Sequence, residues 1–189
     1  HGAAPWLFTM RARHRSRLFP ALSAALLLFA GAANAAGERV LVLDFGLEDD
    51  TLLPRVPAEL ARSAALAPFL RERLKASGVT IIEHSVDAET RALASNGYFI
   101  AHPAAVAALG RAAGADWVAF GVQRKFSFLV SWLRVFLVDV HRDLAVARVE
   151  ADLRGAMNDE RMTRRAAVSL ADQLLDVFST LKRSPVAAR

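Results

Sequence analysis

Lys125 and Ser127 are the two residues whose types and spacing come nearest to a catalytic pair. They lie two positions apart in a predicted strand, so their side chains share one face with that of Gln123. A serine beside a lysine can act as a nucleophile with its base, provided that the lysine is desolvated and loses its proton. Gln123 and the charged face of a strand predicted at 145–154 favour a solvated surface instead. Catalysis, a binding contact and a plain solvated strand face are therefore the three interpretations left open.

A second set of residues that could do chemistry is a series of acidic residues. Asp44 ends a predicted strand, and Glu48, Asp49 and Asp50 follow in a predicted loop. Carboxylate oxygens are the ligands that Ca²⁺ and Mg²⁺ prefer. The series lacks the alternation and the closing glutamate of an EF-hand loop, so a solvated acidic loop is the alternative to a weak metal site.

Arg154 and Gly155 stand at the end of the last predicted strand, just before a helix begins. An arginine together with the free N–H groups of a helix N-terminus can hold an anion. Asp159 and Glu160 argue against an anion, because they already suit the positive end of the helix dipole. An ion pair between Arg154 and a nearby acid is the alternative.

Histidine and glycine patterns offer no further chemistry. Beyond residue 35 the histidines are His84, His102 and His141, and no two of them have the spacing of a helical metal pair. The sequence contains no GxSxG motif, no phosphate-binding glycine loop and no Rossmann fingerprint. We therefore expect no cofactor, and the sequence gives no enzyme signature.

The elements that must position these residues follow from the apolar periodicity. Residues 145–153 alternate small apolar and charged side chains, which is typical of a half-buried strand, and three such strands in succession predict an antiparallel meander. Over 117–128 the even positions are mainly apolar and predict the inward face, while the odd positions turn polar. The expected elements are strand 39–45, loop 46–57, helix 58–76 with a kink or restart at Pro68, strand 79–83, a short helix over 87–94, helix 103–113, strands 117–128, 132–140 and 145–154, and a helix from about 159 to 181. This order predicts an α+β fold with one mixed sheet, a C-terminal antiparallel three-strand meander, and helices packed on one face.

The N-terminal segment predicts export. Four arginines at 11–17 precede an apolar run over 18–32, and small residues at 33–35 complete a secretory signal peptide, with cleavage near Ala35-Ala36. The run is shorter than the roughly 20 residues of a spanning helix, but an uncleaved anchor is the alternative. The predicted organisation is an upstream extension (1–9), a signal peptide (10–35), a single α/β domain (36–182) and a frayed tail (183–189).

Charge and cysteine content narrow the functional classes. Taking the four leader arginines from the total of 24 basic residues leaves 20, against 19 acidic ones, so the exported part has a net charge of +1. Binding to nucleic acid needs a basic surplus and is not expected. The sequence contains no cysteine, which excludes disulfides, thiolate metal sites and lipid attachment through a cysteine. We expect a periplasmic protein with no membrane span after signal cleavage.

Three stretches together resemble a family of exported bacterial proteins known only as a domain of unknown function. They are residues 42–45 with the acidic loop that follows, residues 109–129 from Leu109-Gly110 to Phe128-Leu129, and residues 152–165 from Asp152-Leu153-Arg154-Gly155 to Arg164-Arg165. The resemblance covers residues 38–180 and implies a topology similar to the N-terminal domain of TolB and to lipoprotein activators of cell-wall synthases, which are docking modules. It also implies gene neighbours in periplasmic quinoprotein alcohol oxidation. The chain departs from the family where a cysteine pair is common, near Asn96-Gly97, and at Met162 in place of a tryptophan.

Three functional hypotheses follow. The first is a non-enzymatic periplasmic accessory protein that presents the polar face of its meander, with the acidic loop, to an envelope or periplasmic protein. The second is a periplasmic protein that binds a small molecule or a metal ion. The third is a hydrolase that uses Ser127 and Lys125. The partner, the ligand and the oligomeric state stay open.

Overall fold

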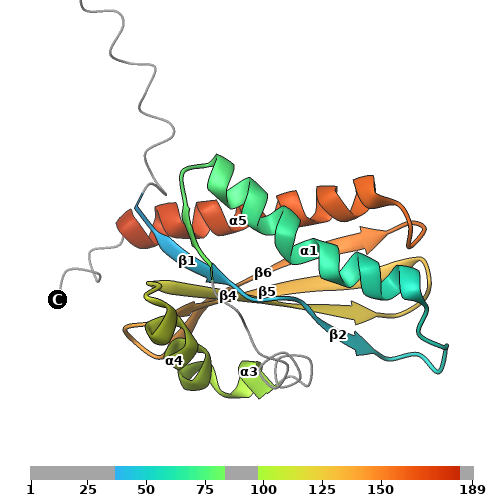
Figure 1. The fold of residues 1–189 in the computed structure, drawn as a ribbon, viewed down its shortest axis with the longest axis horizontal. Helices are drawn as coiled ribbons and strands as arrows, with labels where there is room; N and C mark the ends of the chain where they lie inside the picture. The colour runs from blue at the N-terminus through green and yellow to red at the C-terminus, as the bar shows by residue number, and fades with distance from the viewer. Residues whose placement is uncertain (1–36, 84–97, 184–189) are drawn as a thin grey trace, which may run out of the picture. The chain divides into compact units, whose positions relative to one another are not determined.

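The structure, a computed structural model, describes residues 37–83 and 98–183. Its centre is one mixed sheet of six strands (Figure 1). The strands are β1 (Arg39–Val42), β2 (Gly46–Asp49), β3 (Thr80–Ile82), β4 (Trp117–Lys125), β5 (Val130–Asp139) and β6 (Leu144–Arg154). They lie in the order β3-β1-β4-β5-β6, and β2 pairs with β4. Strands β1, β2 and β3 form parallel pairs, whereas β4, β5 and β6 form an antiparallel meander.

Strands β1 and β2 lie end to end along one edge of β4. β1 pairs with residues 117–119 of β4 and β2 with residues 122–125. Between them the ring of Phe45 lies over Gly121, where a Cβ atom would come within 2.4 Å of the ring. Because Gly121 has no side chain, there is room for the Phe45 ring, and both β1 and β2 can pair with the same strand, β4. The loop predicted at 46–57 is wrong for residues 46–49, because they pair with β4.

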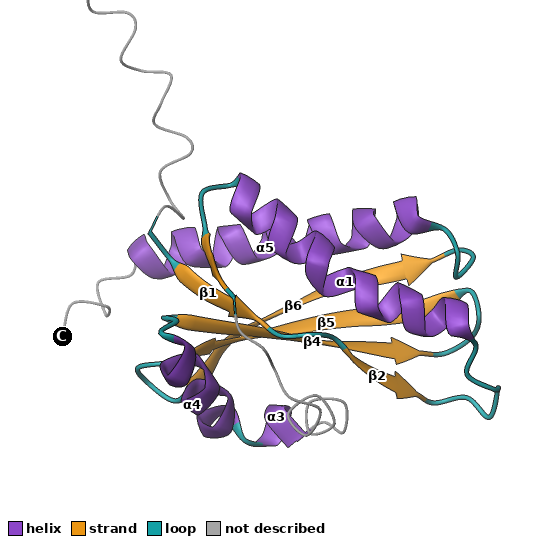
Figure 2. Ribbon diagram, in the orientation of Figure 1, coloured by secondary structure: helices purple, strands orange, loops and turns teal. Residues whose placement is uncertain are grey.

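The two long helices, α1 (Pro57–Ala76) and α5 (Glu160–Arg183), cover one face of the sheet (Figure 2). Leucines spaced three or four residues apart turn the buried stripe of each helix toward the sheet. The stripes are Leu66, Leu70 and Leu74 on α1, and Leu170, Leu174 and Phe178 on α5. Helix α1 continues through Pro68 as one element.

The short helices α3 (Tyr98–Ala101) and α4 (Pro103–Ala113) pack on the opposite face. Val106 of α4 and Phe99 of α3 join a second core cluster with Val118 and Phe120 of β4. Helix α4 begins at Pro103 and ends at Gly114, whose φ of 75° is left-handed, as the sequence predicts. Strands β2, β5 and β6 carry exposed side chains on the other half of this face.

The predicted fold class is confirmed: the fold is α+β, with one mixed sheet and a C-terminal antiparallel meander. The two long helices share one face, and α3 and α4 add a layer to the other. The helix predicted at 87–94 lies outside the described residues. Among the helices of residues 37–83 and 98–183, none is long and apolar enough to cross a membrane. Among the described residues, both clusters of buried core residues fall between Val40 and Phe178.

Candidate functional site

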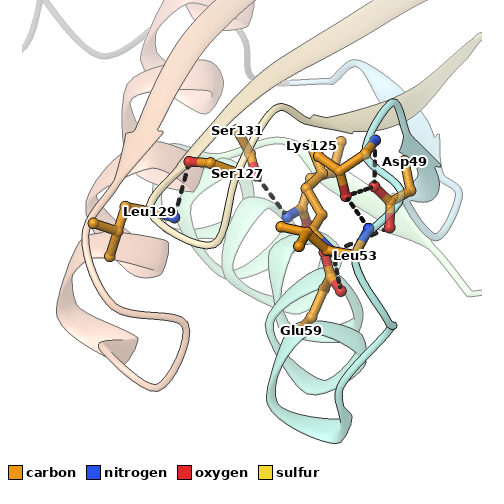
Figure 3. Close-up of polar contacts among 9 residues, drawn as sticks. Asp49, Leu53, Glu59, Lys125, Ser127, Leu129 and Ser131 are labelled. Carbon is orange, nitrogen blue, oxygen red and sulfur yellow. Dashed lines mark hydrogen bonds and ion pairs between the residues drawn. The ribbon is translucent and has the colours of Figure 1, made fainter.

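A buried ion cluster lies beneath the first turns of α1 (Figure 3). Lys125 ends β4, Asp49 ends β2, and Glu59 stands in the first turn of α1. The Nζ atom of Lys125 donates to Asp49 Oδ2 and to Glu59 Oε2, each at 3.0 Å. The Lys125 side chain is 0% exposed, and both carboxylates are buried. The cluster therefore joins two strands and a helix through charges that are largely shielded from water.

The protonation of this cluster follows from its contacts. Burial alone would lower the pKa of Lys125, but the hydrogen bonds to Glu59 and Asp49 outweigh it and raise that pKa. The hydrogen bond from Thr51, supported by Lys125, lowers the pKa of Asp49 to about 2 in spite of desolvation. Lys125 is thus held as an ammonium ion and Asp49 as a carboxylate.

Ser127 does not form a catalytic pair with Lys125. Its Oγ accepts hydrogen bonds from the backbone N–H groups of Leu129 and Val130, at 3.2 and 3.1 Å, and so closes the turn between β4 and β5. The prediction that the two side chains share one face is wrong, because β4 ends at Lys125 and Ser127 already belongs to the turn. A lysine that keeps its proton also cannot act as the base that a serine nucleophile needs.

The solvated face predicted for Gln123 and Lys125 is also wrong, since both side chains are buried. Gln123 donates to Ser131 Oγ at 3.2 Å across the β4–β5 pair. The reason is that α1 covers the odd face of β4, whereas the even positions toward its end lie on the open face. Phe126 and Phe128, predicted to point inward, lie beyond the end of β4 and are exposed, and the ring centroid of Phe128 lies 5.0 Å from Lys125 Nζ.

Several buried polar atoms under α1 have no partner among the described residues. They are Glu59 Oε1, Arg62 Nε, Ser63 Oγ and Gln123 Oε1. Unpaired buried polar atoms are uncommon in folded proteins because each loses its hydration without compensation. The region beneath the first half of α1 is therefore a polar core, in contrast to the leucine core further along the helix.

The opposite face of the meander carries a groove of about 210 Å³, lined by β2, α3 and the ends of β4, β5 and β6. Its lining residues include Glu48, Ile100, Arg124, Trp132, Arg134 and Glu150. Trp132 is 48% exposed and packs edge to face against Phe126, with ring centroids 5.1 Å apart. A large, partly exposed tryptophan on a strand is the kind of side chain that anchors a protein interface.

The charged residues around this groove are paired with one another. Arg134 contacts Glu150 at 2.8 Å, Arg124 contacts Asp50, and Arg154 contacts Asp152 at 2.9 Å. The charged residues that line the groove are Arg124, Arg134, Glu48, Glu150 and Asp152. The groove therefore combines an apolar anchor with a rim that carries charges of both signs.

The remaining predicted site residues are dispersed. Asp44 pairs with Arg71 at 3.0 Å, and this ion pair lies away from the groove. Arg154 pairs with Asp152 and lines a hollow with Met162 and Arg165 of α5. The N-terminus of α5 is capped by Asp159, whose Oδ1 accepts from the N–H groups of Arg161 and Met162. Sequence reasoning did not single out Trp132, because its strand is largely apolar and gave no sign that one of its faces is open.

No metal centre forms among the described residues. Asp49 and Asp50 engage Lys125 and Arg124, and Glu48 lies apart from them at the groove. His102 Nδ1 lies 2.9 Å from the carbonyl of Tyr98, and His141 lies 3.5 Å from Asp116; His84 falls outside the described residues. Residues 37–83 and 98–183 contain no group of three or more His, Asp or Glu that could hold a metal ion.

The model of a family described as "Protein of unknown function (DUF2380)" matches residues 38–174. Because the match spans most of the chain, the protein belongs to this family, and the predicted resemblance to a family of unknown function is confirmed. A search of the curated proteins finds no match.

Solved structures share the fold at low identity. The PelC dodecamer from Paraburkholderia phytofirmans is 17% identical, with 74% of this chain and 86% of that chain covered and a TM-score of 0.42. The LpoB C-terminal domain from Salmonella enterica is 12% identical, with 64% and 85% covered and a TM-score of 0.42. TolB from Acinetobacter baumannii is 13% identical, with 76% of this chain and 28% of that chain covered and a TM-score of 0.42. Likenesses this distant say nothing about what the chain binds.

Proposed function

We propose that this protein is an exported, non-enzymatic accessory protein that docks an envelope or periplasmic protein through the groove of its meander. The observation that carries the proposal is Trp132, which stands partly exposed in the groove and packs against Phe126. A tryptophan held in place by a neighbouring ring loses little conformational entropy when a partner covers it. The paired charges around it resemble the polar rim that surrounds the anchor of a protein interface.

The groove also defines the chemistry of the partner. Because the rim carries charges of both signs, a strongly charged partner gains little, and a neutral surface with one apolar or aromatic side chain fits best. A volume of about 210 Å³ accommodates a single large side chain. We expect the partner in the periplasm, on the basis of the predicted signal peptide, and within quinoprotein alcohol oxidation, on the basis of the family resemblance alone.

The alternatives have less support from the geometry. Binding of a small molecule stays the second candidate, but ligand pockets usually measure roughly 300–1,000 Å³, and this groove is smaller. A metal ion would have to displace Lys125 from Asp49 and Arg124 from Asp50. The hydrolase hypothesis would require Lys125 to lose a proton that Asp49 and Glu59 hold in place.

The docking surface can be tested with a photo-crosslinking amino acid placed at Trp132 or, as a matched control, at Leu144. Leu144 is 56% exposed and lies at the opposite end of β6. In cells that export the protein, we expect the probe at Trp132 to give one reproducible crosslinked protein that the probe at Leu144 does not give. Equal crosslinking from both positions would contradict docking through the groove.

The crosslinked partner then allows a quantitative test. We expect Trp132→Ala to weaken binding to the purified partner by about 2 kcal/mol, or roughly 30-fold, because an interface anchor is lost. The same substitution should leave the thermal unfolding midpoint close to that of the unmodified protein, since half of the side chain already contacts water. An affinity unchanged by Trp132→Ala would show that the groove is not the binding site.

A further inference from the structure

Four large apolar side chains are exposed at one end of the sheet, on two loops beside the groove. Leu52 and Leu53 lie in the loop between β2 and α1, and Phe128 and Leu129 lie in the turn between β4 and β5; we call these four residues the apolar tip. Leu52 is 106% exposed, as open as in an extended peptide, and Leu129 is 60% exposed. Exposed apolar groups that gather in one place mark an interaction surface.

The loops of the apolar tip are fixed to one another by the backbone. The N–H of Asp50 donates to the carbonyl of Lys125 at 3.2 Å, which joins the two loops at their base. The N–H of Gly155 donates to the carbonyl of Leu129 at 2.9 Å, which ties the turn to the end of β6. In Figure 1 the ends of β2, β4, β5 and β6 that meet these loops lie at the same edge of the sheet. The four side chains are thus carried on a common, well-supported end.

At this end of the sheet, two arginines are open to solvent, whereas the acids contact basic side chains of the protein. The carboxylates of Asp49 and Glu59 face inward to Lys125, and that of Asp50 contacts Arg124. Arg55, between Leu53 and α1, is exposed, and Arg161 at the start of α5 is also largely open to solvent. Asp159 lies 3.7 Å from Arg161, but its Oδ1 already accepts from the first turn of α5. Glu160, 73% exposed and 3.9 Å from Arg164, stands beside Arg161, so the apolar tip is flanked by guanidinium groups and by acids that each contact a basic side chain of the protein.

We propose that the apolar tip inserts into the surface of an anionic phospholipid bilayer. Membrane-surface binding combines shallow burial of apolar side chains with attraction of basic groups to anionic headgroups, and both components are present here. A fully exposed leucine has no neighbour that fixes its side chain, which suits a fluid lipid layer better than the shaped pocket of a protein. The proposal goes beyond the docking function, because it uses a different surface and a different kind of partner.

Vesicle sedimentation tests this proposal with the chain from Ala36 onward, the form that the predicted cleavage would leave, which contains all of the described residues. The probes are vesicles of phosphatidylethanolamine with phosphatidylglycerol, and neutral vesicles of phosphatidylcholine. We expect binding to the anionic vesicles to exceed binding to the neutral ones, and to fall about tenfold in the double variant Leu52→Asp/Leu129→Asp. Circular dichroism should show that the double variant stays folded, because both side chains already lie in water.

Two matched variants make the result specific. Leu144→Asp adds the same charge at a leucine of similar exposure but at the other end of β6, and it should leave vesicle binding unchanged. Trp132→Ala should also leave it unchanged, so that lipid binding and protein docking can succeed or fail separately. Absence of binding by the unmodified chain, equal binding to neutral vesicles, or an equal loss in Leu144→Asp would overturn the proposal.

Discussion

Arg124 and Lys125 are neighbours on β4 that carry the same charge, yet they occupy opposite environments. Arg124 contacts Asp50 on the open face and is 46% exposed, whereas Lys125 contacts Asp49 and Glu59 beneath α1 and is fully buried. Alternation along a strand sends the two side chains to opposite faces, and only one of those faces is covered by α1. At this end of the sheet, α1 therefore covers the inner face, and the outer face is open to solvent.

The buried cluster also bears on the register of β2. Asp49 pairs in register with Lys125, and the preceding residue, Glu48, pairs with Arg124. A slip of one residue would exchange the faces of Glu48 and Asp49, so that the longer side chain of Glu48 would face Lys125 and Asp49 would turn to the open face. Taking charges out of water is costly, so the buried cluster by itself is weak evidence of net stability.

The largest expected effect comes from removing the buried cation. Lys125→Met leaves Asp49 and Glu59 buried and unpaired, and we expect the free energy of unfolding in urea to fall by about 3–5 kcal/mol. The matched substitution Arg124→Met removes an exposed pair and should cost about 1 kcal/mol or less. Equal losses in the two variants would contradict the contrast between the two faces.

A second variant keeps this test informative if Lys125→Met does not fold. The triple variant Lys125→Met/Asp49→Asn/Glu59→Gln removes the uncompensated carboxylates together with the cation. We expect it to recover most of the lost stability, because neutral groups replace charges that would otherwise be stranded. A triple variant as unstable as the single one would show that Lys125 acts through packing and not through its charge.

The contrast between the two faces also separates the structural features that the sequence predicts from those that it does not. Alternating small apolar and charged residues over 145–153 predicted β6 and its exposed charges, and Pro103 with Gly114 predicted both ends of α4. These features are local, because each depends on periodicity or on a backbone preference near one residue. They account for the elements and for the fold class.

The environment of Lys125 could not be predicted in the same way. It depends on β2, whose four residues look like a polar loop, and on α1, which crosses the sheet far from β4 in sequence. The strand form of residues 46–49 arises from pairing with β4 and from the close contact of Phe45 with Gly121. Polar side chains at 123 and 125 therefore indicated solvent, although the fold supplies Ser131, Asp49 and Glu59 as buried partners.

A smaller, pH-dependent effect should come from Asp49. Its pKa falls from an ordinary 3.8 to about 2 in the folded protein, through the hydrogen bond from Thr51 and the contact with Lys125. Because the unfolded chain takes up this proton first, the stabilisation is fully present above pH 3.8 and is lost as the pH falls toward about 2. We expect the difference in unfolding free energy between the unmodified protein and Asp49→Asn to shrink across this range. A difference that does not change with pH would contradict the lowered pKa.

The smallest effect should be the coupling between Arg124 and Asp50 on the open face. A double-mutant cycle with Arg124→Met and Asp50→Asn should give a coupling energy of about 0.2–1 kcal/mol that decreases as salt is added, because water and ions screen an exposed pair. The corresponding cycle with Lys125→Met and Asp49→Asn should give a larger value that salt hardly changes, because no solvent reaches Lys125. If both cycles gave small, salt-sensitive couplings, α1 would not seal the inner face as described. If only the outer pair gave a small coupling, Arg124 could exchange Asp50 for an acceptor on a partner at little cost to the fold. The proposed docking through the groove requires such an exchange of a residue at its edge.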